Sequence, residues 1–362
     1  MKEFIRITIF CSFTFFTELS LADEFKSLEI PINQLANEFI KNKTFVGIQV
    51  AIRYQNKEIF NKGYGFANIN ENTPFTHKTI VALGSNTKTF TSTSIQLLAN
   101  QGLINLNDHI EKYFPIKTFK NSGITIRNLL CHTSGISDIY EKENYGNINQ
   151  SSLQQFSNLV DNFPRLSKAN EKFEYNNTGY LFLGRLIEQV SKQSLGDFYR
   201  ENIIAPLDLS NTFYLGDTFF PLNMAQSYEE DFSLINSEHE DYTEYRIAHS
   251  AGALGGTIHD YLLWHENILQ EKLLPKENIQ EMKTACILND GTKTKYGLGL
   301  EIKHVNGYNA YSHGGAINGF TSDAYYFPQR NLIIGFVSNT WVNPTEFRDK
   351  LLELVLTYEL DG

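Results

Sequence analysis

Residues 85–102, SNTKTFTSTSIQLLANQG, predict a buried helix that ends at Gly102. The residues around its first turn are mostly small or apolar, with VALG before it and TFTSTSIQLL after. Ser85 opens the helix and is the only serine of the chain with a lysine, Lys88, three positions later. Side chains at i and i+3 share one helix face. The stretch therefore predicts a serine beside a lysine, away from a free surface.

This pair is what an activated serine requires. A serine hydroxyl is a poor nucleophile until a base removes its proton. A lysine amine can be that base when burial lowers its pKa toward neutrality. The N-terminus of a helix adds backbone N–H groups that suit a developing oxyanion. An S-x-x-K match alone is also compatible with a helix-capping serine and a surface lysine.

The segments on either side of this helix predict one antiparallel sheet made from both ends of the chain. VGIQVAIRY and EIFNKGYGFANIN, joined by a QNK turn, are typical of a hairpin, and strand patterns return from residue 296 onward. We expect an α/β (α+β) fold in one unit over residues 23–362, with a mostly helical region at about 100–245 inserted. Other helices are expected at residues 26–41, 125–131, 178–193, 252–271 and 345–358.

The composition and charge of the chain indicate a folded protein that does not bind nucleic acid. The chain has 362 residues, of which 41% are hydrophobic and 20% charged, so it can bury a large core and is not disordered. Its formal net charge is −10. A duplex-binding protein needs a basic face to neutralise phosphates, and no Lys/Arg cluster supplies one, so nucleic acid is not an expected partner.

Residues 1–22, MKEFIRITIFCSFTFFTELSLA, predict a cleaved export signal. Two basic residues precede an apolar run over residues 7–16, which is too short to span a bilayer as a mature helix. Small residues at Ser20 and Ala22 offer a signal peptidase site. No later stretch is apolar for 18 residues, so we expect no stable membrane anchor after cleavage and a periplasmic or secreted protein.

Only two cysteines, Cys131 and Cys286, follow that signal. A single bridge between them would suit an oxidising compartment. Two isolated cysteines are more often small buried hydrophobic residues, so free thiols are the favoured interpretation.

The motifs of several other enzyme classes are missing from the sequence. There is no G-x-S-x-G, no H-E-x-x-H, no P-loop and no dinucleotide fingerprint. The nine histidines are scattered, without metal-ligand spacing supported by Asp or Glu. We therefore expect neither a metal nor a cofactor.

Two further motifs carry groups that suit a serine–lysine site. The tripeptide Y-N-N from Tyr175 to Asn177 ends a predicted loop just before a helix, where a phenol could relay a proton and an amide could bind a buried lysine. H-G-G from His313 to Gly315 is the only H-x-G of the chain and lies on a predicted strand, where glycines permit close approach by a ligand. The rival K-x-G at residues 295–297 is interpreted as a strand entry. Either motif alone is also compatible with an ordinary loop or strand.

In this order, the three motifs resemble the active-site elements of the serine β-lactamase and penicillin-binding protein superfamily. The tyrosine version with H-x-G is similar to the branch of class C β-lactamases, D-alanyl-D-alanine carboxypeptidases and family VIII esterases. The resemblance covers about residues 30–355 and includes stretches such as GLINLNDHIEKYFP, ITIRNLLCHTSGISD and SAGALGGTIHDYLLW.

The resemblance implies a role for each matching side chain. Ser85 would be the acylated nucleophile and Lys88 its base. Tyr175 would relay a proton, and Asn177 would orient Lys88 and the substrate. His313 would support Tyr175 or bind a substrate carboxylate.

The same resemblance implies an oxyanion hole made by the backbone N–H groups of Ser85 and Ala316. Gly314 and Gly315 would belong to the strand that binds the substrate. The implied reaction is two acyl transfers through an acyl-enzyme, ending in hydrolysis. The substrate would be a small molecule or a peptide, such as a β-lactam, a D-amino-acid peptide or an ester.

Three positions depart from the patterns common in relatives. Asn176 replaces a frequent serine, Cys131 a frequent threonine and His313 a frequent lysine. A neutral histidine holds a substrate carboxylate less strongly than lysine does, which weakens the case for a dedicated β-lactamase. The stretch at residues 132–135 is expected to be structural, as a helix end and a turn.

The sequence leaves the substrate open. We expect an exported serine hydrolase that acts on an amide, β-lactam or ester carbonyl, either as a D-Ala-D-Ala carboxypeptidase or β-lactamase-like enzyme, or as a family VIII-type carboxylesterase. The alternative is a penicillin-binding or sensor protein without turnover. The matching groups at Ser85, Lys88, Tyr175 and Asn177 favour catalysis.

Overall fold

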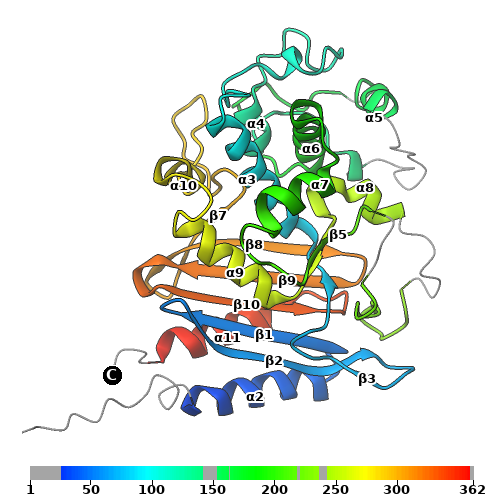
Figure 1. The fold of residues 1–362 in the computed structure, drawn as a ribbon, viewed down its shortest axis with the longest axis vertical. Helices are drawn as coiled ribbons and strands as arrows, with labels where there is room; N and C mark the ends of the chain where they lie inside the picture. Colours follow the sequence, from blue (N-terminus) through cyan, green and yellow to red (C-terminus); the bar gives the residue numbers. More distant parts are fainter. Residues whose placement is uncertain (1–25, 142–152, 163, 218–220, 236–242, 359–362) are drawn as a thin grey trace, which may run out of the picture.

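The main sheet is assembled from both ends of the chain, as expected (Figure 1). The computed structural model describes residues 26–141, 153–162, 164–217, 221–235 and 243–358, so the predicted signal at residues 1–22 lies outside them. Seven antiparallel strands have the order β3-β2-β1-β10-β9-β8-β7. They are β1 (Gly47–Tyr54), β2 (Lys57–Asn68), β3 (Thr73–Pro74), β7 (Glu301–Val305), β8 (Tyr308–Ile317), β9 (Phe320–Phe327) and β10 (Leu332–Ser338).

The two central strands explain why the ends of the chain must meet. Every residue of β1, GIQVAIRY, and of β10, LIIGFVS, is buried, which is the pattern of strands covered on both faces. They pair directly, with Ile48 opposite Ser338 and Tyr54 opposite Leu332. At Gly335 of β10 a side chain would collide with Ile258, so this glycine lets a helix pack closely on the sheet.

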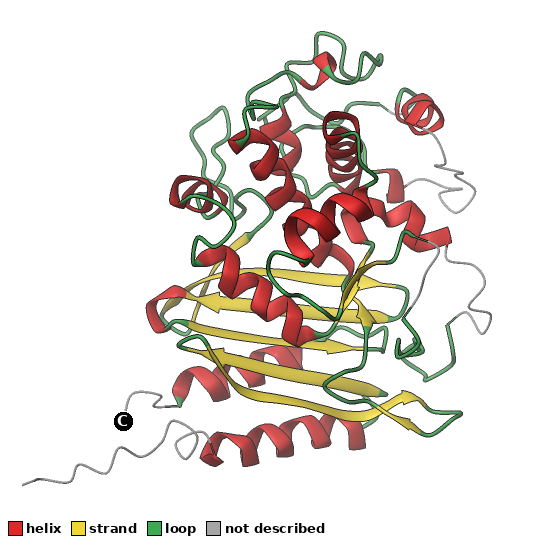
Figure 2. Ribbon diagram, viewed as in Figure 1, coloured by secondary structure: helices red, strands yellow, loops and turns green. Residues whose placement is uncertain are grey.

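Helices cover both faces of the sheet (Figure 2). On one face lie α2 (Lys26–Lys41) and α11 (Thr345–Thr357), with a core in which the rings of Phe39, Phe45 and Phe347 meet. The other face carries α9 (Ile258–Leu269) and the helices of the middle of the chain. No helix among the residues described is both long and apolar enough to cross a membrane.

The middle of the chain is mostly helical and packs around α3 (Thr87–Asn100), whose residues 87–98 are all buried. A small second sheet with the order β4-β6-β5 lies beside it. The further helices are α4 (Ile126–Leu130), α5 (Leu153–Val160), α6 (Asn177–Ser191), α7 (Leu195–Tyr199), α8 (Thr243–Gly252) and α10 (Lys276–Met282). The strands of the small sheet are β4 (Val81–Ala82), β5 (Thr212–Tyr214) and β6 (Leu254–Gly256).

The prediction of a single helix at residues 252–271 is wrong for its first residues. There α8 ends, β6 follows, and α9 starts at Ile258. The two glycines of β6, LGG, are poor helix formers, and the strand gains pairing on both sides, with β4 and with β5. Thr257 then caps α9, because its side chain accepts a hydrogen bond from the backbone N–H of Asp260.

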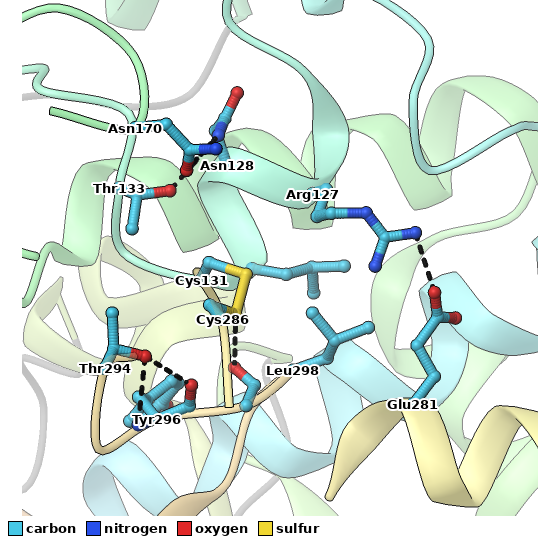
Figure 3. Close-up of a disulfide and its surroundings, with 12 residues drawn as sticks. Arg127, Asn128, Cys131, Thr133, Asn170, Glu281, Cys286, Thr294, Tyr296 and Leu298 are labelled. Carbon is cyan, nitrogen blue, oxygen red and sulfur yellow. Dashed lines mark hydrogen bonds and ion pairs between the residues drawn. A yellow bond between two sulfur atoms is a disulfide. The ribbon is translucent and has the colours of Figure 1, made fainter. Parts of the chain in front are cut away.

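The two cysteines are joined, so the expectation of free thiols is wrong. Cys131 follows α4 and Cys286 follows α10, and a disulfide links them across 155 positions of sequence (Figure 3). Their Cα atoms are 6.0 Å apart. Such a contact between distant segments depends on how α4 and the loop after α10 pack, which the local sequence around either cysteine does not reveal.

Removing this cross-link is expected to lower the free energy of unfolding by about 2–4 kcal/mol, because the unfolded chain regains the freedom of a long loop. The measurement is urea unfolding of the wild type and of a Cys131→Ser/Cys286→Ser double variant. The wild type in reductant should approach the double variant, and the double variant itself should not respond to reductant. Equal unfolding midpoints for oxidised wild type and double variant would contradict the prediction.

Candidate active site

Ser85 lies on a tight turn between the small sheet and α3. The turn is a single 3₁₀ segment, Gly84–Asn86, and the Thr87 hydroxyl closes it by donating to the Gly84 carbonyl at 2.7 Å. Gly84 has φ +53°, and a Cβ there would lie 2.7 Å from the backbone nitrogen of Ala316. Only glycine fits such a position without strain. The turn therefore holds Ser85, which is partly exposed, against the strand that carries Ala316.

Lys88 is fully buried one helical turn below Ser85. Its Nζ makes three hydrogen bonds, to Ser85 Oγ at 2.9 Å, to Asn177 Oδ1 at 2.8 Å and to the Ala251 carbonyl at 2.8 Å. Burial lowers the pKa of Lys88 to about 7, against the opposing effect of the Asp138 carboxylate. A substantial fraction of this amine is therefore neutral near pH 7, as a general base for Ser85 must be.

Asn177 joins Lys88 to a buried carboxylate. Its Oδ1 accepts from Lys88, while its Nδ2 and its backbone N–H both donate to Asp138 Oδ2, at 3.0 and 2.7 Å. The preceding residue, Asn176, caps α6 by accepting from the Gly179 N–H. The helix start and Asp138 together fix the amide of Asn177 so that its oxygen is directed at the amine.

Tyr175 places its ring beside the same amine. Lys88 Nζ lies 4.9 Å from the centre of the Tyr175 ring, and 38% of the tyrosine is exposed. Burial of the phenol raises the pKa of Tyr175 well above its ordinary value, although the Ser85 hydroxyl acts in the opposite direction. The phenol therefore stays protonated at the pH values near 7 at which the Lys88 amine loses its proton. By this difference in pKa, Lys88 is the better candidate for the base and Tyr175 for a proton donor.

His313 is buried on β8 with both ring nitrogens occupied. Its Nδ1 donates to the Gly314 carbonyl at 2.7 Å, and its Nε2 accepts from the Tyr296 hydroxyl at 2.9 Å. Burial lowers the pKa of His313 to about 4, so the imidazole is neutral near pH 7. The ring centres of His313 and Tyr175 are 6.3 Å apart, and Tyr296 lies against both. His313 can thus support Tyr175 through Tyr296, but it offers no positive charge to a carboxylate.

The backbone of β8 forms the wall opposite the serine. A side chain at Gly315 would overlap the Leu83 carbonyl, so the strand approaches the serine turn closely. Its neighbour β7 pairs with β8 only as far as Ser312. The backbone nitrogen of Ala316 lies close to the serine turn, only 2.7 Å from where a Cβ on Gly84 would be. This is the position that an oxyanion donor beside Ser85 requires.

Residues 32–358 match the model of the Beta-lactamase family. The chain belongs to the beta-lactamase family. Its relatives include the Flp protein of Staphylococcus aureus (strain MW2), 32% identical over 188 residues, which cover 51% of this chain but only 38% of Flp. Penicillin-binding protein 4* of Bacillus subtilis (strain 168) is 25% identical over 312 residues, which cover 82% of this chain and 68% of the relative.

Solved structures agree with this fold. D-amino acid amidase from Ochrobactrum anthropi SV3, complexed with L-phenylalanine, has a TM-score of 0.80 and 22% identity over 91% of this chain and 98% of the amidase. The octameric penicillin-binding protein homologue from Pyrococcus abyssi has a TM-score of 0.77 and 23% identity over 92% of this chain and 78% of that one. At these identities, the likeness establishes the beta-lactamase-type fold alone.

The structure brings together all the side chains that the sequence selected for a beta-lactamase-family site, namely Ser85, Lys88, Tyr175, Asn177 and His313. It adds Asp138 and Tyr296, which the sequence did not select, and it places His132, expected to be structural, against the Tyr175 ring. Asp138 and His132 lie in the quoted stretch ITIRNLLCHTSGISD, but nothing in that stretch indicates which side chains turn inward. Tyr296 belongs to the K-x-G that was interpreted as a strand entry.

Two other features lie outside this site. A cavity of about 580 Å³ is lined partly by Asn318 and Phe320, which follow β8, but not by Ser85, Lys88 or Tyr175. In the part of the chain that the structure describes, no group of three or more His, Cys, Asp or Glu side chains could hold a metal ion. The candidate active site is the cluster around Ser85.

Proposed function

We propose that this protein is a serine hydrolase that forms an acyl-enzyme on Ser85 and acts on a small-molecule amide, ester or β-lactam carbonyl. The observation that carries the proposal is the buried Lys88 amine, 2.9 Å from Ser85 Oγ and with a pKa lowered to about 7. A surface lysine would be fully protonated and could not serve as a base. Membership of the beta-lactamase family supports the same chemistry.

In the proposed acylation, one proton passes from Ser85 to the leaving group by way of Lys88 and Tyr175. Neutral Lys88 takes the hydroxyl proton as Ser85 Oγ attacks the carbonyl carbon. The N–H groups of Ser85 and Ala316 stabilise the resulting oxyanion. As the bond to the leaving group breaks, the Tyr175 phenol gives its proton to the departing nitrogen or oxygen and recovers one from Lys88. Water then attacks the acyl-enzyme with the same groups in reverse order.

The neutral His313 favours leaving groups without a carboxylate. A lysine at this position would offer a cation to the carboxylate of a β-lactam or a C-terminal peptide, whereas His313 is neutral and already engaged on both nitrogens. We therefore rank uncharged amides and esters ahead of carboxylate substrates. The likeness to an amidase solved with L-phenylalanine amide is in keeping with this order.

A matched pair of substrates tests this preference. Acetyl-D-Ala-D-Ala and acetyl-D-Ala-D-alaninamide present the same scissile bond but differ in the carboxylate of the leaving group. We expect kcat/KM to be at least about tenfold higher for the amide. A tenfold difference corresponds to about 1.4 kcal/mol, the cost assigned here to a carboxylate that has no partner charge in the transition state. His313→Lys should reduce or reverse the difference. Faster cleavage of the carboxylate peptide by the wild type would refute the ranking.

We also propose that the protein works in an oxidising compartment, the periplasm or the medium. The export signal expected at residues 1–22 and the disulfide between Cys131 and Cys286 support this, since such bridges are rare in the reducing cytosol. Fractionation of cells that produce the full chain, with mass spectrometry of its N-terminus, tests it. Cytoplasmic protein that still begins at Met1 would overturn it.

A further inference from the structure

His132 binds the loop that carries Tyr175 at two places. The backbone N–H of Glu174 donates to the His132 carbonyl at 2.8 Å, and the backbone N–H of Asn176 donates to His132 Nδ1 at 2.9 Å. The residues on both sides of Tyr175 are therefore bound to the same histidine. Because Tyr175 itself is partly exposed, these two bonds fix the direction in which its side chain leaves the backbone.

The ring of His132 also supports the phenol directly. Its centre lies 4.3 Å from the centre of the Tyr175 ring and 4.7 Å from that of Tyr296, and the imidazole is almost completely buried. A backbone N–H can only donate, so Nδ1 is the unprotonated nitrogen and the proton lies on Nε2. Burial, together with the nearby Lys88 amine, keeps the pKa of His132 well below its ordinary value, so the imidazole is neutral near pH 7 and this tautomer persists.

The backbone conformation of His132 is unusual for a residue with a side chain. Its φ of +57° lies in the left-handed region, which most residues avoid and which asparagine tolerates best among residues with a side chain. The preceding residue, Cys131, is tied by the disulfide to Cys286, whose backbone N–H donates to the Tyr296 carbonyl at 2.9 Å (Figure 3). The disulfide thus connects the support of Tyr175 to the segment whose hydroxyl binds His313.

We propose that His132 is a positioning residue for the Tyr175 phenol in acyl transfer. The inference rests on the proposed function, because it assumes that Tyr175 protonates the leaving group. Through its Nδ1, His132 holds the loop so that the Tyr175 side chain keeps its place against Lys88. It acts through Tyr175, and its effect is confined to the step in which the leaving group departs.

Three substitutions separate the hydrogen-bond acceptor of His132 from its ring contact with Tyr175. In His132→Asn, the amide oxygen occupies nearly the place of Nδ1 and can accept the Asn176 N–H, and asparagine suits the positive φ. In His132→Gln, the same amide lies one methylene farther out and cannot. His132→Phe keeps the ring contact with Tyr175 but removes the acceptor. Each purified variant is checked for folding by circular dichroism and thermal unfolding.

The readout is the dependence on the leaving group. An alkyl amide needs a proton on its departing nitrogen, whereas p-nitrophenolate leaves without one. We expect His132→Gln and His132→Phe to lower kcat for an alkyl amide by about 30–100-fold, with KM changed less than about threefold. For the p-nitrophenyl ester of the same acyl group, kcat should fall less than about fivefold. His132→Asn should restore amide turnover to within about fivefold of the wild type.

The outcomes separate this inference from the proposed function. If the wild type neither hydrolyses the ester nor labels with a fluorophosphonate at Ser85, the proposed function fails, and the inference with it. If the wild type is active but His132→Gln lowers amide and ester turnover equally, His132 is only structural and the inference is overturned. Equal activity of the Asn and Gln variants also overturns it, even if His132→Phe does not fold.

Discussion

Replacing Ser85 with alanine is expected to lower kcat for every acyl substrate by roughly 10⁴- to 10⁶-fold, the range seen when the nucleophile of a serine hydrolase is removed. The hydroxyl is the only group on the serine turn that lies 2.9 Å from the Lys88 amine, so no neighbouring side chain can take its place. Substrate binding should survive, because the oxyanion donors belong to the backbone. The measurement is steady-state hydrolysis of p-nitrophenyl esters and short amides.

Covalent labelling makes this test specific. A fluorescent penicillin and a fluorophosphonate should label the wild type on the peptide that contains Ser85, as located by mass spectrometry, and should not label Ser85→Ala. Ser210→Ala, which removes an exposed hydroxyl elsewhere, is the matched control and should label like the wild type. Unchanged labelling of Ser85→Ala would exclude it as the nucleophile. Labelling of the wild type without turnover of any substrate would favour a penicillin-binding or sensor protein.

Replacing Lys88 with alanine is expected to lower kcat by about 10²- to 10⁴-fold, the usual contribution of a general base, with a smaller change in KM. The pH dependence identifies the group. Because burial lowers the pKa of Lys88 to about 7, its amine is protonated and inactive below pH 7 and neutral and active above it. In the wild type, kcat/KM should therefore rise with pH and level off above a midpoint near 7.

Two variants control the assignment of that midpoint. Lys88→Arg keeps a positive charge that cannot be lost near pH 7, so its remaining activity should lack the rise. Lys120→Ala, which removes an exposed lysine, should keep the rise unchanged. A midpoint near 7 that persists in Lys88→Ala would assign the titration to another group and remove Lys88 as the base.

The order of elements and the reacting side chains could be predicted from sequence because their signals are local. A hairpin pattern before residue 70 and strand patterns after residue 296 predict one sheet made from both ends of the chain, and the structure confirms it by pairing β1 with β10. Ser85 and Lys88 are neighbours on one helical turn, so their contact follows from spacing alone. Tyr175 and Asn177 flank the start of α6, which the sequence predicts within one residue.

The supporting groups could not be predicted, because each depends on segments that meet only after folding. Asp138 reaches Asn177 from a loop that precedes it by 39 positions. His132 was expected to be structural as part of a helix end, and the backbone confirms the turn, but its ring contact with Tyr175 exists only in three dimensions. The disulfide joins segments 155 positions apart, and the Tyr296–His313 hydrogen bond also links two segments that meet only in the fold.

The pairing of β1 with β10 has a consequence for the chain while the ribosome is still synthesising it. The strand that contains Ile48 has no neighbour on that side until Ser338 has been synthesised. At about 5–20 residues per second, synthesis leaves β1 and β2 without this partner for tens of seconds. During that interval the apolar edge of β1 is open to other chains, which is the condition under which aggregation competes with folding. Chaperone demand and yield should therefore depend on how quickly the last strand is delivered.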